Sequence, residues 1–369
     1  MVDSHLIDYT KLSKYSLIMA KRLARKICND TPTKNVDIVK EYHYSQESLG
    51  KFATLDPDFI KDIGLFRQAI ERYSNDRTLT RPLNFLMLAD PGTGKSFFVE
   101  CLSKAMNDFG LIGVDCNLST FRDIGDMLPA IEMMRNHKVN DKLPILLIDE
   151  FDVLDDMASL LPLLWDGTVN IGHSKLRTGK AIIILAGSRP DVGKYVSSWQ
   201  SMTEKQQQTN EDLLKIKKLN DLLSRINGGY IRLPTLKGVQ NKNLEIVCIA
   251  NKICITIAAL QSRFGKHLYE VPWALLRLIA SISFKHNIRS LVTFLNFIDN
   301  EKDILESGVI TVNHLKSLPL NDAGTFRKSC VNQHLRTNRN FTVAKIIKKW
   351  NEYCIIDSTV RFQVLPPKP

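Results

Sequence analysis

The sequence predicts an α/β fold in which helices flank a parallel sheet, followed by an all-helical segment. Three apolar runs carry this prediction, at residues 85–88, 144–148 and 181–186. Each run is short and nearly continuous, and apolar residues at helical spacing lie between the runs. Such runs are typical of parallel strands that are buried on both faces. The alternation of strand and helix therefore favours a sheet with crossover helices.

Length and composition are those of an ordinary globular chain. The 369 residues, 44% hydrophobic and 24% charged, predict two or three domains. The seven cysteines form no C-x-x-C pair, so we expect no disulfide framework, no zinc site and a reducing, cytoplasmic compartment. No signal peptide or membrane span is expected, because Asn251 and Lys252 interrupt the longest apolar region, 246–260.

The charge balance favours an acidic partner. The formal net charge is +11 and the isoelectric point about 9.2, which points weakly to nucleic acid. Part of this charge lies in the tail, where residues 321–369 hold nine Lys or Arg and three acids. A second basic patch, residues 21–26, is either a solvated helix face or a nucleic-acid contact.

The first apolar run leads into a loop of small residues, Ala89–Ser96, and then into an amphipathic helix. The loop follows the pattern G-x-x-x-x-G-K-[ST], with Ala89 at the first glycine position. Gly92 and Gly94 allow backbone N–H groups to surround a phosphate, and Lys95 can neutralise it. We therefore predict a phosphate-binding loop for ATP. Its expected contact residues are Asp90, Pro91, Gly92, Thr93, Gly94, Lys95, Ser96 and Phe97.

Two carboxylates end the second apolar run. Because parallel strands present their carboxyl ends at one edge of a sheet, Asp149 and Glu150 should lie near the loop. Asp149 and the Ser96 hydroxyl are oxygen ligands that suit Mg²⁺. Glu150 suits the general base that polarises the attacking water. The alternative is that Asp149 or Asp152 caps a helix.

The other core elements are expected in order along the chain. Asp56 should cap a helix through residues 59–70, residues 110–117 should form a strand, and a helix should start near Phe121. The strand 181–187 ends at Ser188, which either contacts the attacking water or γ-phosphate or is a turn serine before Pro190. Residues 191–218 are either a long helix or a flexible insert.

These motifs resemble the AAA+ ATPases over about residues 59–234, and over a lid to about residue 318. Residues 89–96 resemble Walker A and 146–150 resemble Walker B. Ser188 stands where the family has its sensor 1 residue, with Arg189 and Thr168 as lower-ranked candidates. Arg225, just before the strand 230–233, resembles the arginine finger, and Arg289 resembles the sensor 2 arginine.

The resemblance implies a five-stranded parallel sheet, a helical lid, and ATP with Mg²⁺ bound between subunits of a ring or helical homo-oligomer. It divides the chain into a helical N-terminal segment (1–55), a nucleotide-binding core (56–236), a helical lid (237–320) and a basic tail (321–369). In the tail, a helix with apolar residues 343, 346, 347 and 350 is followed by an expected strand pair, 354–356 and 359–364. The helix either packs on the lid or docks on a partner.

The expected activity is that of an ATPase that couples hydrolysis to remodelling or loading of a partner, associated with nucleic acid. The alternative is a protein remodeller or an ATP-gated assembly switch in a multi-protein complex, such as a bacterial defence or signalling system. Phe121 and Gly125 follow the second strand but are not adjacent, which disfavours a polypeptide-threading loop.

Overall fold

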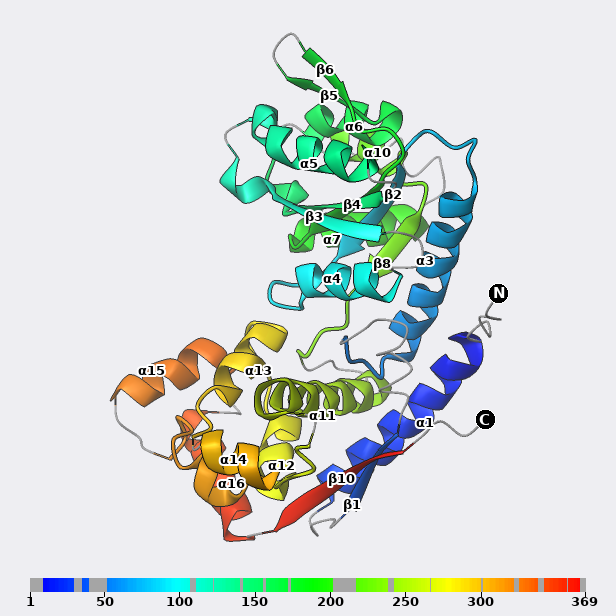
Figure 1. Ribbon diagram of the computed structural model, residues 1–369. Coiled ribbons are helices and arrows are strands. Elements are labelled where there is room, and N and C mark those ends of the chain that lie inside the picture. Colours follow the sequence, from blue (N-terminus) through cyan, green and yellow to red (C-terminus); the bar gives the residue numbers. More distant parts are fainter. Residues whose placement is uncertain are drawn as a thin grey trace. The chain divides into compact units, whose positions relative to one another are not determined.

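The computed structural model (Figure 1) describes residues 9–29, 35–39, 52–106, 111–121, 123–139, 142–154, 157–171, 174–201, 217–237, 242–265, 267–299, 301–321, 325–337, 342–356 and 358–365. The chain divides into two compact units. The core unit comprises residues 62–90 and 95–233. The lid unit comprises the described residues of 1–61, 91–94 and 234–369.

The core unit is built on a five-stranded sheet whose described strand pairs are all parallel, which confirms the predicted fold class. Its strands are β2 (Leu83–Leu88), β3 (Leu111–Asn117), β4 (Leu143–Asp149), β7 (Ile182–Gly187) and β8 (Gly229–Arg232). They lie in the order β3-β4-β7-β2-β8, so the strand that leads into the glycine loop lies between β7 and β8. Gly110, expected in the second strand, lies outside the described residues.

Helices cover both faces of this sheet (Figure 1). The helices of the core unit are α3 (Pro57–Asn75), which begins in the lid unit, α4 (Lys95–Ala105), α5 (Leu128–Val139), α6 (Leu161–Asp166), α7 (Pro190–Ser201) and α10 (Lys217–Leu223). One face packs against apolar residues of α5, α6, α7 and α10. On the other face, Phe66 of α3 stacks on Phe85 of β2 and meets Phe98 of α4. The central strands are therefore buried on both faces, as their apolar sequences predict.

Two connections of the core unit differ from the expected pattern. The hairpin of β5 (Thr168–Ile171) and β6 (Ser174–Arg177) was not expected, because its sequence is short and polar. The helix expected over 191–218 appears as α7 and α10, and residues 202–216 between them lie outside the described part of the chain. At the start of the unit, Asp56 caps α3 as expected, since its Oδ1 accepts from the Phe59 N–H at 3.0 Å.

The lid unit is mostly helical. Its larger helices are α1 (Tyr9–Cys28), α11 (Lys242–Phe264), α12 (Trp273–Ser281), α13 (Asn287–Leu295), α15 (Thr325–His334) and α16 (Val343–Ile355). Helix α11 is long and apolar enough to cross a membrane by length and composition. It instead contributes Ile253, Ile257 and Leu260 to one hydrophobic core with α1 and α12. Burial in a protein core explains its apolar sequence.

A three-stranded sheet joins distant parts of the chain within the lid unit. Strand β10 (Thr359–Leu365) pairs in parallel with β1 (Asn35–Val39) and antiparallel with β9 (Glu270–Pro272). The expectation of a purely helical segment over 1–55 is therefore wrong at β1. Because the partner of β1 lies more than 300 residues away in sequence, no local pattern reveals it.

The basic tail packs into the lid unit, as one of its two interpretations predicts. Ile346 and Trp350 of α16 are buried, whereas Lys345 and Lys348 are exposed. The strand expected at 354–356 is wrong, because α16 continues through Ile355. Tyr353 explains the longer helix, since its ring packs edge-on against Trp273 at 5.5 Å.

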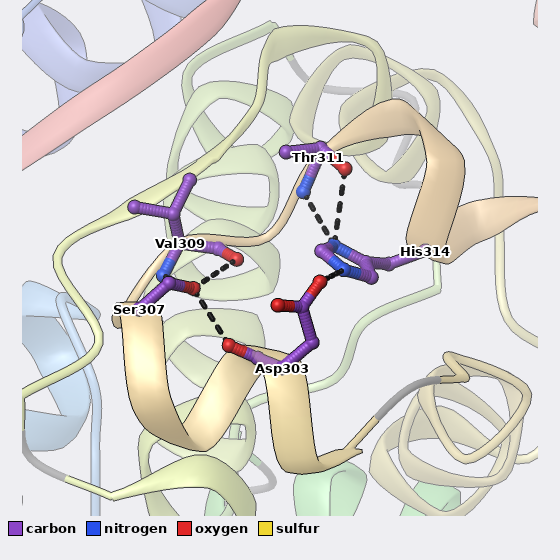
Figure 2. Close-up of polar contacts among 5 residues, drawn as sticks. All are labelled: Asp303, Ser307, Val309, Thr311 and His314. Carbon is purple, nitrogen blue, oxygen red and sulfur yellow. Dashed lines mark hydrogen bonds and ion pairs between the residues drawn. The ribbon is translucent and has the colours of Figure 1, made fainter.

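A histidine stabilises the connection after α14 (Glu301–Ser307), as Figure 2 shows. The His314 Nδ1 accepts a hydrogen bond from the Thr311 N–H at 2.9 Å, and its Nε2 lies 2.9 Å from Asp303 Oδ2. The Nδ1 contact belongs to a capping box with Thr311, and the Nε2 contact ties the same ring to α14. This cluster is a structural element of the lid unit, with neither ring nitrogen free to act on a ligand.

Candidate functional site

The loop after β2 has the backbone that a phosphate-binding loop requires. Gly92 and Gly94 adopt positive φ values of 79° and 89°, which other residues rarely tolerate. Ala89 is not among the described non-glycine residues with positive φ, so alanine fits this first glycine position without strain. Its N–H donates to the Gly187 carbonyl at 3.1 Å and continues the pairing of β2 with β7.

Lys95 and Asp149 meet at the carboxyl edge of the core sheet. Lys95 is the first residue of α4 and 9% exposed, and its Nζ lies 3.0 Å from Asp149 Oδ1 at the end of β4. The two side chains come from segments that are 54 residues apart in sequence. The carboxylate compensates the charge of the buried ammonium group. Ser96 and Phe97, the next residues of α4, are exposed.

Glu150 has an unusual backbone conformation. It follows β4 directly, with φ 57° and ψ 38°, in the left-handed region that costs free energy for any residue except glycine. Its own N–H donates to Asp149 Oδ1 at 3.0 Å, which fixes the peptide between the two acids. Glu150 and Asn287 are the non-glycine residues at positive φ in the described part of the chain. Strain of this kind often marks a functional position.

Asp152 connects the end of β4 to the end of β7. It is fully buried, and its Oδ2 accepts from the backbone N–H groups of Ser188 at 2.8 Å and Arg189 at 2.7 Å. The Arg189 Nη1 in turn donates to the Asp152 carbonyl at 3.1 Å. The Asp152 carboxylate thus binds the two residues that precede α7 (Pro190–Ser201), not the first N–H groups of that helix. The same contacts hold Ser188, the sensor 1 candidate, at the sheet edge that carries Glu150.

Thr168, a lower-ranked sensor 1 candidate, lies elsewhere. It begins β5, is 2% exposed and pairs with Arg177 of β6. It therefore does not stand at the carboxyl end of any strand of the core sheet. Ser188 and Arg189 remain the residues at the end of β7.

Asp115 on β3 is an additional acid that we did not expect at this edge. Partial burial and the nearby carboxylates of Asp149 and Glu100 raise the pKa of Asp115 above its usual value. When folding raises the pKa of a group, that group contributes stability to the folded protein at pH values below the pKa it has in the unfolded chain. This contribution is lost as the pH rises through the folded pKa.

We expect Asp115→Asn to raise the melting temperature of the nucleotide-free protein at pH 7, since the amide carries no charge. This increase in melting temperature over the wild type should become smaller as the pH falls toward about 4, the ordinary pKa of an aspartate. Thermal unfolding followed over this pH range checks the prediction. Glu132→Gln, at an exposed position on α5, is the control. An Asp115→Asn effect that does not vary with pH would contradict it.

Comparison with known families identifies this part of the core unit. Residues 85–194 match the family model described as ATPase family associated with various cellular activities (AAA). The chain carries an AAA-type ATPase domain. The match runs from β2 into α7, and so includes the glycine loop, Asp149, Glu150 and Ser188. None of the curated proteins compared with the chain matches it.

The tip of the AAA domain's glycine loop, residues 91–94, belongs to the lid unit. There the Arg289 N–H donates to the Gly92 carbonyl at 3.1 Å, and Asn287 Nδ2 donates to the Pro91 carbonyl at 3.2 Å. A Cβ atom added to Gly92 would come within 2.2 Å of the His286 carbonyl oxygen. Gly92 is thus required by packing as well as by its φ angle. Arg289, the sensor 2 candidate, is exposed and joined to this loop through its backbone.

Asn287 is a residue of this loop contact that our sequence reasoning did not single out. It is fully buried, with φ 51°, and its Oδ1 accepts from the Leu236 N–H at 2.9 Å while its amide group contacts Pro91. In the sequence, the one indication that Asn287 contacts the loop was its position two residues before Arg289. An asparagine tolerates the left-handed region better than most residues, which suits this position.

Arg225, the arginine-finger candidate, lies at the opposite edge of the core sheet. Its carbonyl accepts from the side chain of Asn84, the second residue of β2, at 2.9 Å. The loop begins at Ala89, about 16 Å farther along the strand. The Arg225 guanidinium donates to the Asp221 carbonyl and lies 3.4 Å from Ser224 Oγ. The structure therefore places Arg225 at the amino edge of the core sheet, away from the carboxyl edge that carries Lys95 and Asp149.

Proposed function

We propose that the chain binds and hydrolyses ATP with Mg²⁺, and that hydrolysis occurs between subunits of a ring-like or helical homo-oligomer. The observation that carries this proposal is the 3.0 Å contact between Lys95 Nζ and Asp149 Oδ1 at the end of a glycine loop. Loop, lysine and carboxylate together provide the parts that position a triphosphate in P-loop ATPases. The match to the AAA family model supports the same chemistry.

The residues present fit Mg²⁺ as well as ATP. Asp149 supplies a carboxylate and Ser96 an exposed hydroxyl, both of which are hard oxygen ligands that Mg²⁺ prefers. Within the described residues, no three His, Cys, Asp or Glu side chains gather to hold a metal ion. A magnesium ion that is bound mainly through substrate phosphates and water does not need such a cluster. When bound, Mg²⁺ neutralises charge on the β- and γ-phosphates.

Within this proposal, Glu150 is the base that orients and polarises the attacking water, and Ser188 contacts the water or the γ-phosphate. The left-handed backbone of Glu150 supports this role, because strained residues cluster at catalytic positions. The Asp152 carboxylate supports the role of Ser188, since it accepts from the Ser188 backbone N–H and holds this segment at the same edge. Asp90, Thr93 and Phe97 complete the loop that encloses the nucleotide.

Arg225 supports hydrolysis between subunits. Because it lies at the amino end of β2, it can serve only the nucleotide of another copy of the chain. An arginine supplied in trans to a transferring phosphoryl group is worth about 10³-fold or more in rate. A subunit without a neighbour is therefore a poor ATPase in this account.

We expect Arg225→Ala to lower ATP turnover by about 10³-fold while ATP affinity stays close to that of the wild type. Turnover per wild-type subunit should also rise with protein concentration, as subunits associate. Steady-state phosphate release and binding of a fluorescent ATP analogue measure the two effects. An Arg225→Ala protein with wild-type turnover would remove this residue from the site.

We further propose that the ATPase remodels or loads a nucleic-acid-associated partner in a reducing, cytoplasmic setting. The net charge of +11 supports an acidic partner, and exposed Arg22 and Arg25 of α1 and Lys348 of α16 add to this charge. Free thiols at all seven cysteines support the reducing compartment.

A surface groove favours the alternative of a protein partner. The groove, of about 610 Å³, lies over α16, with Val343, Ile347 and Ile355 among its apolar lining residues and Lys328 and Lys348 among its charged ones. Ile355 is 82% exposed, which is unusual for so large an apolar side chain. A partner segment with apolar and acidic side chains would suit these residues. In that case the chain acts as a protein remodeller or as an ATP-gated assembly switch.

A further inference from the structure

An exposed tryptophan lies between two arginines at the amino edge of the core sheet. The Cζ atoms of Arg81 and Arg225 lie 4.2 Å and 5.9 Å from the ring centroid of Trp165. Trp165 is 47% exposed and Arg81 is exposed, so the ring and this arginine face solvent. We call these three residues the Arg81–Trp165–Arg225 cluster.

Asn84 fixes the backbone of this cluster. Its buried side-chain amide donates to the Leu164 carbonyl at 2.7 Å and to the Arg225 carbonyl at 2.9 Å. One residue of β2 therefore holds both the residue before Trp165 and Arg225 itself. Arg81 comes from the turn that leads into the same strand, where its carbonyl accepts from the Tyr73 hydroxyl at 2.9 Å. Three separate segments thus meet at a fixed point of the core unit.

The two guanidinium groups keep their charge available. In the described part of the chain, neither Arg81 nor Arg225 has a carboxylate within salt-bridge distance. Among the described residues, the Arg225 guanidinium donates to two neutral groups, the Asp221 carbonyl and the Ser224 hydroxyl. An aromatic face attracts a guanidinium but does not neutralise it. Two such cations beside one ring suit a multiply charged anion such as a triphosphate.

Charge complementarity selects a second copy of this chain as the occupant. Basic residues precede four core strands, at Lys142, Lys180, Arg81 and Arg225, and mark the amino edge. The opposite edge carries Asp90, Asp115, Asp149 and Glu150, and would carry the bound triphosphate. If the amino edge of one copy contacts the carboxyl edge of the next, the same contact can form again on each added copy, in a head-to-tail arrangement. This is the geometry of rings and open helical assemblies.

We propose that Trp165 positions Arg225, and that Arg81 acts as a second phosphate-contacting arginine, in the nucleotide site of the neighbouring subunit. This inference rests on the proposed function and extends it by two residues outside the arginine-finger segment. In this proposal the Trp165 ring holds the two guanidinium groups on one surface, with their Cζ atoms 4.2 Å and 5.9 Å from its centroid. Arg81 adds a cation to the transferring phosphoryl group, where negative charge accumulates.

The test measures ATP turnover and ATP affinity for the full chain with Trp165→Leu, Trp165→Phe or Arg81→Gln. We expect Trp165→Leu and Arg81→Gln each to lower kcat by about tenfold, the order that loss of a cation–π or phosphate contact gives, with ATP affinity within about twofold. Trp165→Phe keeps an aromatic face and should retain most of kcat. Arg135→Gln, at an exposed arginine on α5, is the matched control.

A subunit-mixing experiment separates action in trans from a structural effect. Trp165→Leu subunits keep their own ATP site, and Glu150→Gln subunits keep the cluster. Mixed assemblies should therefore turn over ATP faster per Trp165→Leu subunit than Trp165→Leu protein alone. This inference is overturned if kcat is unchanged in Trp165→Leu, or if mixing does not raise the turnover per Trp165→Leu subunit. In either case, ATP turnover by the wild-type protein still upholds the proposed function. Wild-type protein without any turnover overturns both.

Discussion

Replacing Lys95 by alanine is expected to weaken ATP binding by about 100-fold and to abolish hydrolysis. Lys95 is the cation at the start of α4, and its side chain is 9% exposed, with the ammonium group beside Asp149. A charge-assisted hydrogen bond contributes about 1.5–3 kcal/mol, and each 1.4 kcal/mol is tenfold in affinity. Equilibrium titration with a fluorescent ATP analogue in the presence of Mg²⁺ measures the loss.

Lys104→Ala is the matched control for this change. Lys104 lies in the same helix, but it is 70% exposed and pairs with Glu100 on the helix surface. Its removal should leave ATP affinity unchanged, since exposed pairs contribute little. Lys95→Met keeps most of the side-chain volume and separates the loss of charge from a packing defect. Wild-type ATP affinity in both Lys95 variants would contradict the proposed loop.

Glu150→Gln is expected to leave ATP binding intact and to lower kcat by about 10²- to 10⁴-fold. Glutamine keeps the size of the side chain but cannot accept a proton, and general base catalysis is worth about this factor. Because the variant holds ATP without hydrolysing it, it should also accumulate the assembled state. Single-turnover kinetics together with ATP affinity measure the two properties.

The Glu150→Gln protein also identifies the partner. We expect acidic material to copurify with it in the presence of ATP, either nucleic acid or a protein with acidic and apolar segments. Nucleic-acid affinity must fall steeply with salt, because phosphate contacts release counterions. Salt-insensitive or absent nucleic-acid binding would exclude the first alternative. A Glu150→Gln variant with wild-type kcat would remove this residue from the site.

The central strands and the glycine loop could be predicted from sequence because local pattern specifies them. The runs that became β2, β4 and β7 are continuous and apolar, and the residues at their carboxyl ends determine where Asp149 and Glu150 lie. Once the strands are parallel, these ends share one edge. The meeting of Lys95 and Asp149 at 3.0 Å follows from that geometry.

Long-range contacts account for what could not be predicted. Strand β1 depends on β10 for its pairing, and the hydrogen bond between Asp152 and Ser188 spans 36 residues. Asn287 and Trp165 have ordinary sequence surroundings, and only the fold places them against Pro91 and Arg225. The continuation of α16 through Ile355 likewise depends on packing, with Tyr353 against Trp273, rather than on local propensity.

Isothermal titration of wild-type protein with ATP and Mg²⁺ is the most direct test of the proposed nucleotide site. We expect saturable binding with a dissociation constant between about 1 μM and 1 mM, the range in which enzymes commonly hold their substrates. The dissociation constant should rise by about 100-fold in Lys95→Ala. No saturable heat from the wild-type protein at millimolar ATP would contradict a magnesium–triphosphate pocket formed by Lys95, Ser96 and Asp149.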